Sequence, residues 1–309
     1  MSTPEPSVFL ESPVVVKPKR RAPRKINLVP WIFLAPAVIV FATYVVIPIF
    51  QSFWLSLYDW DGLSPTKKFL GLSNYTELFQ DDQFWTSLKN NLYWLILFLL
   101  GPVVGLAIAI FLNQKIRAMR IVKSLFFFPF VLSGVVIGLV FSWFYEPAHG
   151  LLSTILSMFG LPAISPLSDE HWVTPAIIAA GLWPQIAYCM ILYLTGLTAV
   201  DPEQIEAARI DGARGMKMLW HVIMPQLRPA TFIAVVVTII GALRSFDLVQ
   251  VMTDGGPFGR SSILAYFMFQ QSITNFRMGY GAAIAVVLFL IMSVFIALFL
   301  RHMIRNERT

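Results

Sequence analysis

The residues that most often carry chemistry are few in this sequence and widely scattered. Its four histidines are His149, His171, His221 and His302, and Cys189 is the only cysteine. No two of them have the spacing of metal ligands, and no nucleophile motif or phosphate-binding loop occurs. We therefore expect no catalytic site, no metal site and no cofactor bound by this chain.

Two ionisable residues lie inside an apolar stretch and are the first candidates for a functional role. Arg244 and Asp247 stand three residues apart, which predicts that they share one face of a helix. Charged side chains inside a membrane segment are costly, and they usually face a cavity or a partner. Two interpretations stay open: a mutual ion pair that fixes a helix bundle, or an Arg244 side chain that faces a solute path.

A second group of candidates lies in the preceding apolar stretch. Gln185, Tyr188 and Tyr193 could offer hydrogen bonds to a solute, and Trp183 could offer a stacking face to a sugar ring. Amide and aromatic side chains in membrane helices also pack helices together. Both roles stay open for each of these four residues.

Composition identifies the solvent of most of the chain as lipid. Apolar residues make up 57% of the 309 residues and charged residues 13%, against roughly a quarter charged in soluble proteins. The net charge of +6 is spread in short basic blocks between apolar runs. Nucleic-acid binding would need a clustered basic face with stacking aromatics, so we expect no nucleic-acid partner.

Six apolar stretches approach or exceed the roughly 20 residues that a helix needs to cross a bilayer. Only helices can satisfy the backbone of such segments in lipid outside a closed barrel, so we predict an all-α integral membrane protein with six transmembrane helices. The predicted spans are Trp31–Phe50, Leu92–Leu112, Leu125–Tyr145, Val173–Leu197, Ala230–Val251 and Ala282–Leu300.

Basic residues predict the orientation of these spans. The two tails and the second and fourth loops carry six, three, four and four Lys and Arg residues, seventeen in all, whereas the opposite side carries five. Cytoplasmic loops hold the excess of Lys and Arg. We therefore expect both termini in the cytoplasm.

The fourth loop, on the predicted cytoplasmic side, carries strong helix signals. Asp201 suits an N-cap, Pro202 suits the first helical position, and Gln204 would complete a capping box. Gly212 is a natural helix stop. A second short helix is predicted after it, with an apolar stripe at Met216, Leu219, Trp220 and Ile223 and an end at Pro225. On these signals alone, an ordinary interfacial loop stays as open as a docking element.

This loop resembles the EAA loop of binding-protein-dependent ABC importer permeases. The resemblance is carried by Glu206-Ala207-Ala208, by Asp211-Gly212-Ala213 and by Ile223-Met224-Pro225, with Met224 where a leucine is common. Other segments are similar to the carbohydrate-uptake branch, which includes maltose and glycerol-phosphate type permeases. They are Phe69-Leu70-Gly71-Leu72-Ser73-Asn74-Tyr75, Phe246-Asp247, Thr253-Asp254-Gly255-Gly256-Pro257 and Met278-Gly279-Tyr280-Gly281-Ala282-Ala283.

The resemblance implies a type I ABC importer permease fold, a multi-pass location in the inner membrane of a bacterial cell, and a division of labour. A second permease, two ATPase subunits that hold ATP and Mg, and an extracytoplasmic solute-binding protein are the implied partners. The implied solute is a sugar or a sugar-like molecule. Contact with an ATPase is implied for the residues of the EAA loop, Glu206, Ala207, Ala208, Asp211, Gly212 and Pro225.

The implied organisation has three parts. Residues 1–27 form a basic, disordered tail; residues 28–303 form the permease domain, with the helix-turn-helix coupling loop at 201–228; and residues 304–309 form a C-terminal tail. Two alternatives remain: an ABC importer permease for a non-sugar solute, and an autonomous secondary transporter. The latter normally shows two related halves, and it would not need a docking loop.

Overall fold

The computed structural model describes residues 29–114 and 119–307, so the predicted tail at 1–27 lies outside the described residues. The chain divides into two units, Met1–Pro48 and Ile49–Thr309. The described part is mostly helical, and its only paired strands are two residues long each. No cluster of three or more potential metal ligands occurs among the described residues.

The first apolar stretch forms α1 (Val29–Phe41), a π-helical turn η1 (Ala42–Val46) and α2 (Ile47–Leu55). Within the turn, the backbone N–H of Ile47 donates to the Ala42 carbonyl five residues earlier. The next residue, Pro48, has no N–H, and a proline commonly produces such a local change of helical pitch. Residues Ile32–Leu55 are long and apolar enough to cross a membrane.

A short hairpin and a helix follow. Strand β1 (Tyr58–Asp59) pairs antiparallel with β2 (Lys68–Phe69), and α3 (Ser73–Gln80) comes next. The Asp61 carboxylate accepts hydrogen bonds from the Ser64 hydroxyl and from the backbone N–H groups of Ser64 and Leu63. These bonds favour the charged form and lower the pKa of Asp61 to about 2. The hairpin turn is therefore stabilised by a carboxylate that stays ionised at neutral pH.

The second predicted span is longer than the sequence indicated. Helices α4 (Asp82–Phe98) and α5 (Leu100–Leu112) form one candidate span of 31 residues, which begins ten residues before Leu92. The Asp81 carboxylate caps it by accepting from the Gln83 N–H at 2.8 Å. The first three turns of α4 contain too many polar residues for a hydropathy criterion, although the Asn90 and Asn91 side chains in the third turn are buried against protein.

The third predicted span is a pair of helices with a sharp bend. Helices α6 (Met119–Val131) and α7 (Gly134–Phe144) meet at 99°. Ser133 separates them, and its hydroxyl accepts from the Val136 N–H to cap α7. A short helix, α8 (Leu151–Met158), follows. The predicted span Leu125–Tyr145 is therefore not one continuous helix, because a new N-cap interrupts the apolar run.

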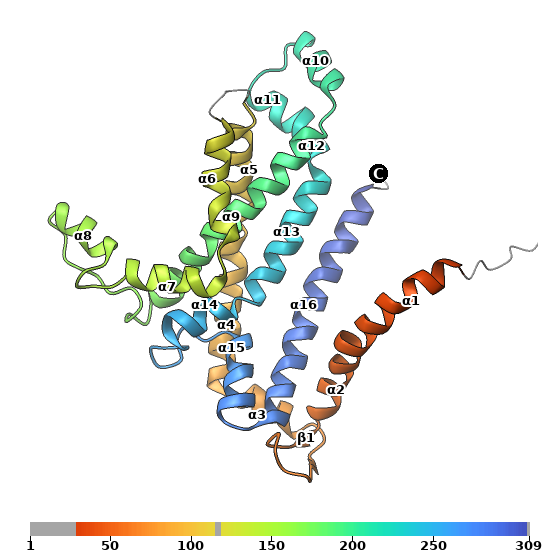
Figure 1. Ribbon diagram of the computed structural model, residues 1–309, viewed down its shortest axis with the longest axis vertical. Helices are drawn as coiled ribbons and strands as arrows, with labels where there is room; N and C mark the ends of the chain where they lie inside the picture. Colours follow the sequence, from red (N-terminus) through yellow and green to blue (C-terminus); the bar gives the residue numbers. More distant parts are fainter. Residues whose placement is uncertain (1–28, 115–118, 308–309) are drawn as a thin grey trace, which may run out of the picture. The chain divides into compact units, whose positions relative to one another are not determined.

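Helix α9 (Val173–Thr198) is a single helix of 26 residues at the centre of the second unit. It packs against α5, α6 and α13 along its length (Figure 1). A Cβ atom on Gly105 of α5 would lie 2.6 Å from the Cβ of Cys189, so glycine allows the close approach of α5 and α9.

After α9 the chain forms α10 (Pro202–Ile210), α11 (Met216–Met218), a π-helical turn η2 (Leu219–Ile223) and α12 (Met224–Gln226). The chain then bends by 75° at Leu227 and enters α13 (Arg228–Leu243). In Figure 1, α10 and α11 lie at one end of the bundle.

The remaining elements are α14 (Phe246–Thr253), α15 (Leu264–Phe269), a π-helical turn η3 (Gln270–Thr274) and α16 (Met278–Glu307). Helices α14 and α15 lie toward the end of the bundle away from α10 (Figure 1). Helix α16 continues past residue 303, where the sequence predicted the start of a tail. Its segment Met278–Phe299 is a further candidate span.

Among the described residues, four helices are long and apolar enough to cross a membrane, and the number rises to six if each bent pair counts as one span. The apolar core of the second unit has two parts. The larger surrounds Trp94, Ile177 and Phe267, and the smaller surrounds Leu112, Met190 and Leu227. The smaller part lies directly beneath α10 and η2, since Ile205 and Ile223 pack on it.

Candidate coupling loop and solute-facing residues

The first arm of the loop 201–228 is a well-capped short helix. The Asp201 carboxylate accepts from the Glu203 N–H at 2.9 Å, and Pro202 occupies the first turn of α10. At the other end, Ala213 N–H donates to the Ala208 carbonyl and Gly212 N–H donates to the Arg209 carbonyl. This pair of bonds, with Gly212 at φ +81°, is a Schellman motif. The predicted start and stop of this helix are confirmed.

The predicted capping box between Asp201 and Gln204 is wrong, because the Asp201 N–H has a different acceptor. The Asp201 N–H donates to Oε1 of Gln226, at 2.9 Å, and not to Gln204. The Gln226 amide nitrogen then donates to Oε1 of Gln204 at 3.2 Å and to the Val222 carbonyl at 3.1 Å. One side chain therefore ties the N-terminus of α10 to α12, which immediately precedes α13.

The second arm buries a different face from the predicted stripe. Met218 is buried, and Ile223 packs on the core, but Met216 and Trp220 are 66% and 59% exposed. The π-helical turn η2 causes the difference, because it adds a residue to one turn and rotates the stripe. Pro225 does not end the arm; it lies in the first turn of α12 (Met224–Gln226), and the direction of the chain changes at Leu227.

Most of the loop surface is open to a partner. Glu206, Ala207 and Asp211 are exposed, Ala208 is half-buried, and an added Cβ on Gly212 would meet nothing within 4 Å. Ile210, two residues before Gly212, is 87% exposed. Exposed apolar side chains beside a charged helix face are typical of a surface that another protein covers.

The candidates on α9 differ in their surroundings. Nε2 of Gln185 donates to Oγ1 of Thr238 on α13 at 2.7 Å, which joins two helices. Tyr193 is buried in the smaller core. Tyr188 stacks on Phe130 of α6, with ring centroids 4.9 Å apart. Gln185, Tyr188 and Tyr193 thus all contact neighbouring helices in this conformation.

Trp183 has a more open environment. Its ring packs edge-on against Phe141 of α7, and it is 37% exposed. It also lines an apolar hollow of about 390 Å³ together with Phe126 and Pro129. An apolar hollow of this kind suits packing against a hydrocarbon surface more than hydrogen bonding to a hydroxylated solute.

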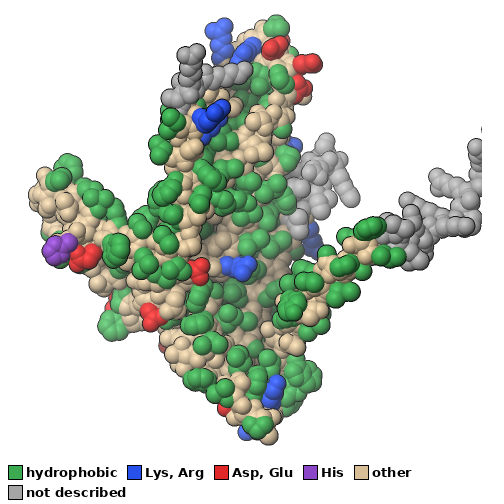
Figure 2. All heavy atoms as spheres, viewed as in Figure 1, with side chains coloured by type: hydrophobic (Ala, Val, Ile, Leu, Met, Phe, Trp, Pro, Cys, Tyr) green, Lys and Arg blue, Asp and Glu red, His purple; other side chains and the backbone are tan. Residues whose placement is uncertain are grey.

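Arg244 and Asp247 do not share a helical face. Helix α13 ends at Leu243, and α14 begins at Phe246, so the two residues lie on either side of a break. Both side chains are exposed, and no ion pair joins them in the described part of the chain. The predicted shared face is therefore wrong. Figure 2 shows a few acidic and basic side chains midway along a surface that carries many hydrophobic side chains.

Asp247 lies at two helix N-termini. It is in the first turn of α14, and an added Cβ on Gly134 would lie 3.2 Å from its Oδ2 atom, which places the carboxylate at the first turn of α7. Helix N-termini stabilise negative charge. The breaks that interrupt two predicted spans therefore bring an exposed carboxylate close to two helix starts.

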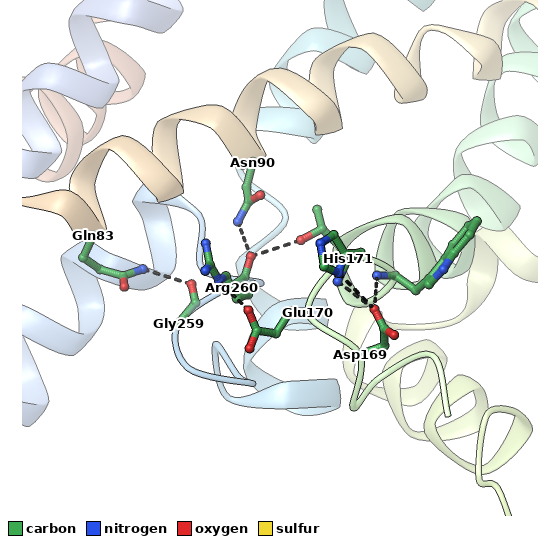
Figure 3. Close-up of polar contacts among 9 residues, drawn as sticks. Gln83, Asn90, Asp169, Glu170, His171, Gly259 and Arg260 are labelled. Carbon is green, nitrogen blue, oxygen red and sulfur yellow. Dashed lines mark hydrogen bonds and ion pairs between the residues drawn. The ribbon is translucent and has the colours of Figure 1, made fainter. Parts of the chain in front are cut away.

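A polar network at the far end of the bundle from α10 was missed by the sequence analysis (Figure 3). Nδ2 of Asn90 donates to the carbonyls of Arg260 and Ser262, at 2.6 and 2.7 Å. Nε of Arg260 donates to Oε2 of Glu170 at 3.0 Å, and Gln83 donates to the Gly259 carbonyl. This network joins α4, the start of α9 and the connection between α14 and α15.

Comparison with known proteins agrees with this architecture. Residues 101–308 match the family model described as binding-protein-dependent transport system inner membrane component. A probable ABC transporter permease, YurN of Bacillus subtilis, is 36% identical over 86% of this chain and 92% of its own. The multiple sugar-binding transport system permease MsmF of Streptococcus mutans is 31% identical over 85% and 91%.

A solved structure shares the fold. A chain of a bacterial alginate ABC transporter, crystallised with its alginate pentasaccharide-bound periplasmic protein, superposes with a TM-score of 0.78 at 21% identity. The match covers 90% of this chain and 94% of the other. The type I importer permease fold is confirmed. The chain belongs to the family of inner membrane components of binding-protein-dependent ABC transport systems.

Proposed function

We propose that this chain and a second permease line the pathway by which an ABC importer takes up a sugar or sugar-like solute. A solute-binding protein outside the membrane delivers the solute, and two separate ATPase subunits hold ATP and Mg. The names of relatives support the solute class, MsmF being a permease of a multiple sugar-binding system. Both termini and the coupling loop 201–228 lie in the cytoplasm, as the basic residues indicate.

The construction of the coupling loop is the observation that carries the proposal. Its first helix is capped at both ends, its Glu206 and Gly212 are open, and Gln226 ties it to the chain that enters α13. A rigid element of this kind can pass a displacement from an ATPase to the membrane helices, as in a hinge or rigid-body transition. The contact residues are Glu206, Ala207, Ala208, Asp211, Gly212 and Pro225.

The solute path runs past the break between α13 and α14. Arg244 and Asp247 are exposed there, within an otherwise apolar bundle, which favours a water-filled cavity. Of the α9 candidates, Gln185 lies near this break, with its Oε1 atom 3.6 Å from an added Cβ on Gly241. Trp183, Tyr188 and Tyr193 are the other proposed solute contacts on α9. In the present conformation Gln185 and Tyr193 are engaged with neighbouring helices, so they reach a solute only if α9 moves relative to α13.

Reconstitution tests the proposal. The purified complex of both permeases and the ATPase subunits, in liposomes, should hydrolyse ATP faster when the loaded solute-binding protein is added outside. Transport by this chain alone, without ATP, would contradict the proposal and favour an autonomous carrier. Binding of a radiolabelled sugar to the solute-binding protein, in competition with amino acids and peptides, tests the solute class.

Cysteine labelling tests the orientation. Cys189 is buried, so the native chain supplies a background with little reactivity. In intact cells an impermeant maleimide should label Ser64→Cys in the hairpin turn and should spare Lys217→Cys in the coupling loop. Both positions are exposed on the chain. Labelling of Lys217→Cys from outside would overturn the orientation.

A further inference from the structure

The connection between α14 and α15 presents one aromatic side chain to solvent in a strained conformation. We call residues Asp254–Ser262 the outer turn. Phe258, at its tip, is 88% exposed, the most exposed large hydrophobic side chain among the described residues. Its φ angle is +51°, and Asp254, Gly255 and Gly259 also have positive φ. A bulky residue with φ above zero is uncommon, and such strain gathers at binding sites.

The outer turn is held rigidly from the side of α4. Asn90 is buried, and it bonds the carbonyls of Arg260 and Ser262 (Figure 3). Gln83 donates to the Gly259 carbonyl at 3.0 Å, and the buried Ser87 and Ser262 hydroxyls share a hydrogen bond. Buried, satisfied polar networks specify one conformation. The carbonyls on the C-terminal side of Phe258 are therefore fixed.

The outer turn is also held from the side of α15. The Tyr266 hydroxyl donates to the Asp254 carbonyl at 2.7 Å, and its ring lies against Gly255, where an added Cβ would be 2.4 Å from Cε1. Burial, followed by the nearby Asp254 carboxylate, raises the pKa of Tyr266 to about 12. The hydroxyl therefore stays a donor at every physiological pH. Phe258 stands on a turn that is braced on both sides.

A polar hollow lies beside the Phe258 ring. It has a volume of about 530 Å³, and its lining residues are Asp82, Gln83, Thr86, Glu170, Phe258 and Arg260. Arg260 is paired with Glu170, so the Asp82 carboxylate leaves the hollow with a net negative charge. An exposed aromatic next to a polar, charged hollow has the composition of a non-obligate protein interface, with an aromatic anchor inside a polar rim.

We propose that Phe258 and this hollow form a docking surface for the soluble solute-binding protein. Phe258 enters an apolar pocket on that protein, and a basic or amide side chain of that protein enters the hollow. A rigid, preorganised anchor suits this role because little conformational entropy is lost on each docking event. The inference rests on the proposed function, which places this end of the bundle outside the cell.

The composition of the surface argues against two other occupants. The hollow contains two carboxylates, which disfavour the phosphate of a lipid headgroup. A second permease would form a permanent interface, and such interfaces are large and mainly apolar. The charged rim around Phe258 fits a partner that binds, releases and binds again.

Substitutions that keep the backbone conformation at position 258 test whether the Phe258 ring anchors the binding protein. Asparagine tolerates positive φ, so Phe258→Asn should keep the turn while it removes the ring. The concentration of loaded binding protein that gives half-maximal ATPase stimulation should rise about tenfold or more, as expected for an interface hot spot. Phe258→Tyr should stay within about threefold of the native value. The yield of assembled complex should be the same for all three proteins.

Phe276 supplies a matched control. It also has positive φ, at +52°, and is 54% exposed, but it does not line the hollow and does not belong to the outer turn. Phe276→Asn should leave the half-maximal concentration unchanged. An unchanged value in Phe258→Asn, in a complex that the binding protein still stimulates, overturns the docking surface alone. If the native complex shows no stimulation by any loaded binding protein, the proposed function itself fails.

Photo-crosslinking identifies the occupant directly. A photoreactive phenylalanine analogue at position 258, in the complete complex in intact cells, should crosslink to the soluble solute-binding protein in the presence of its solute. The same analogue at position 276 should give little of this product. Crosslinks from position 258 to the second permease, or to lipid only, would overturn the proposal.

Discussion

Oε1 of Gln226 lies 2.9 Å from the backbone nitrogen of Asp201 and accepts its hydrogen bond. The two residues are 25 positions apart, one just after α9 and the other just before α13. The bond therefore closes the coupling loop at its base, where the chain leaves and re-enters the membrane helices. Force applied to α10 reaches both spans together, because the two ends of the loop cannot separate while this bond holds.

Removal of the Gln226 amide should loosen the coupling loop. Gln226→Leu leaves the Asp201 N–H without its partner, at a cost of about 1 kcal/mol. We expect a complex that assembles and hydrolyses ATP but takes up less solute per ATP, measured in proteoliposomes. Gln204→Leu is the matched control, since it removes only the longer bond at 3.2 Å. Equal uptake per ATP in Gln226→Leu and the native complex would contradict the role of this bond.

The hydrogen bond between Gln185 and Thr238 should stabilise the contact of α9 with α13. Thr238 is buried, and its hydroxyl also donates to the Ala234 carbonyl at 2.7 Å. In a double-mutant cycle with Gln185→Leu and Thr238→Val, we expect a coupling energy of about 0.6–2 kcal/mol in thermal unfolding of the complex. Strict additivity of the two changes would show that the contact is absent in the assembled transporter.

Arg244 should act on the solute and not as a structural partner of Asp247. Because no ion pair joins the two residues, Arg244→Ala should leave the yield of assembled complex unchanged and lower uptake. Asp247→Asn should reduce the stability of the complex, by about 0.3–2 kcal/mol, since two helix N-termini stabilise the native carboxylate. The exchange Arg244→Asp with Asp247→Arg should not restore uptake. Restoration would revive the ion-pair interpretation.

Local signals were read correctly from the sequence, and contacts between distant residues were not. The start of α10 at Asp201 and its stop at Gly212 depend on neighbouring residues, so cap rules predicted both. The bond from Gln226 to Asp201 depends on how two arms meet, and Gln204 was the nearer choice by sequence. The η2 turn moved Trp220 to the surface, because a helical stripe assumes a constant pitch.

Hydropathy also concealed the breaks. The mean hydropathy of Ala230–Val251 is apolar whether or not the helix stops at Leu243. Arg244 is compatible with a continuous helix and with a helix that ends just before it. Two adjacent polar residues, Asn90 and Asn91, lie just before an apolar run. They were the only indication in the sequence of the polar network that joins α4 to the connection between α14 and α15. They were not interpreted, because burial of an amide can be recognised only when its partners are known. The exposure of Phe258 had no sequence signal beyond the glycines around it.

Contact of Gly212 and Glu206 with an ATPase is tested most directly by a pair of glycine substitutions. Gly212 and Gly160 both follow a helix in a Schellman motif, both have positive φ, and neither has an atom within 4 Å of an added Cβ. A tryptophan should therefore strain the backbone equally at either site, by about 1 kcal/mol. Only Gly212 lies in the coupling loop.

The measurement is the amount of ATPase subunit that co-purifies with a tagged permease, followed by ATP hydrolysis with the loaded binding protein. We expect Gly160→Trp to retain both, and Gly212→Trp to lose most of the bound ATPase while it stays paired with the second permease. Glu206→Lys should also weaken the contact, since a reversed charge at an interface can cost about 2–5 kcal/mol. Full ATPase content and full stimulation in Gly212→Trp and Glu206→Lys would contradict the assignment of the coupling loop.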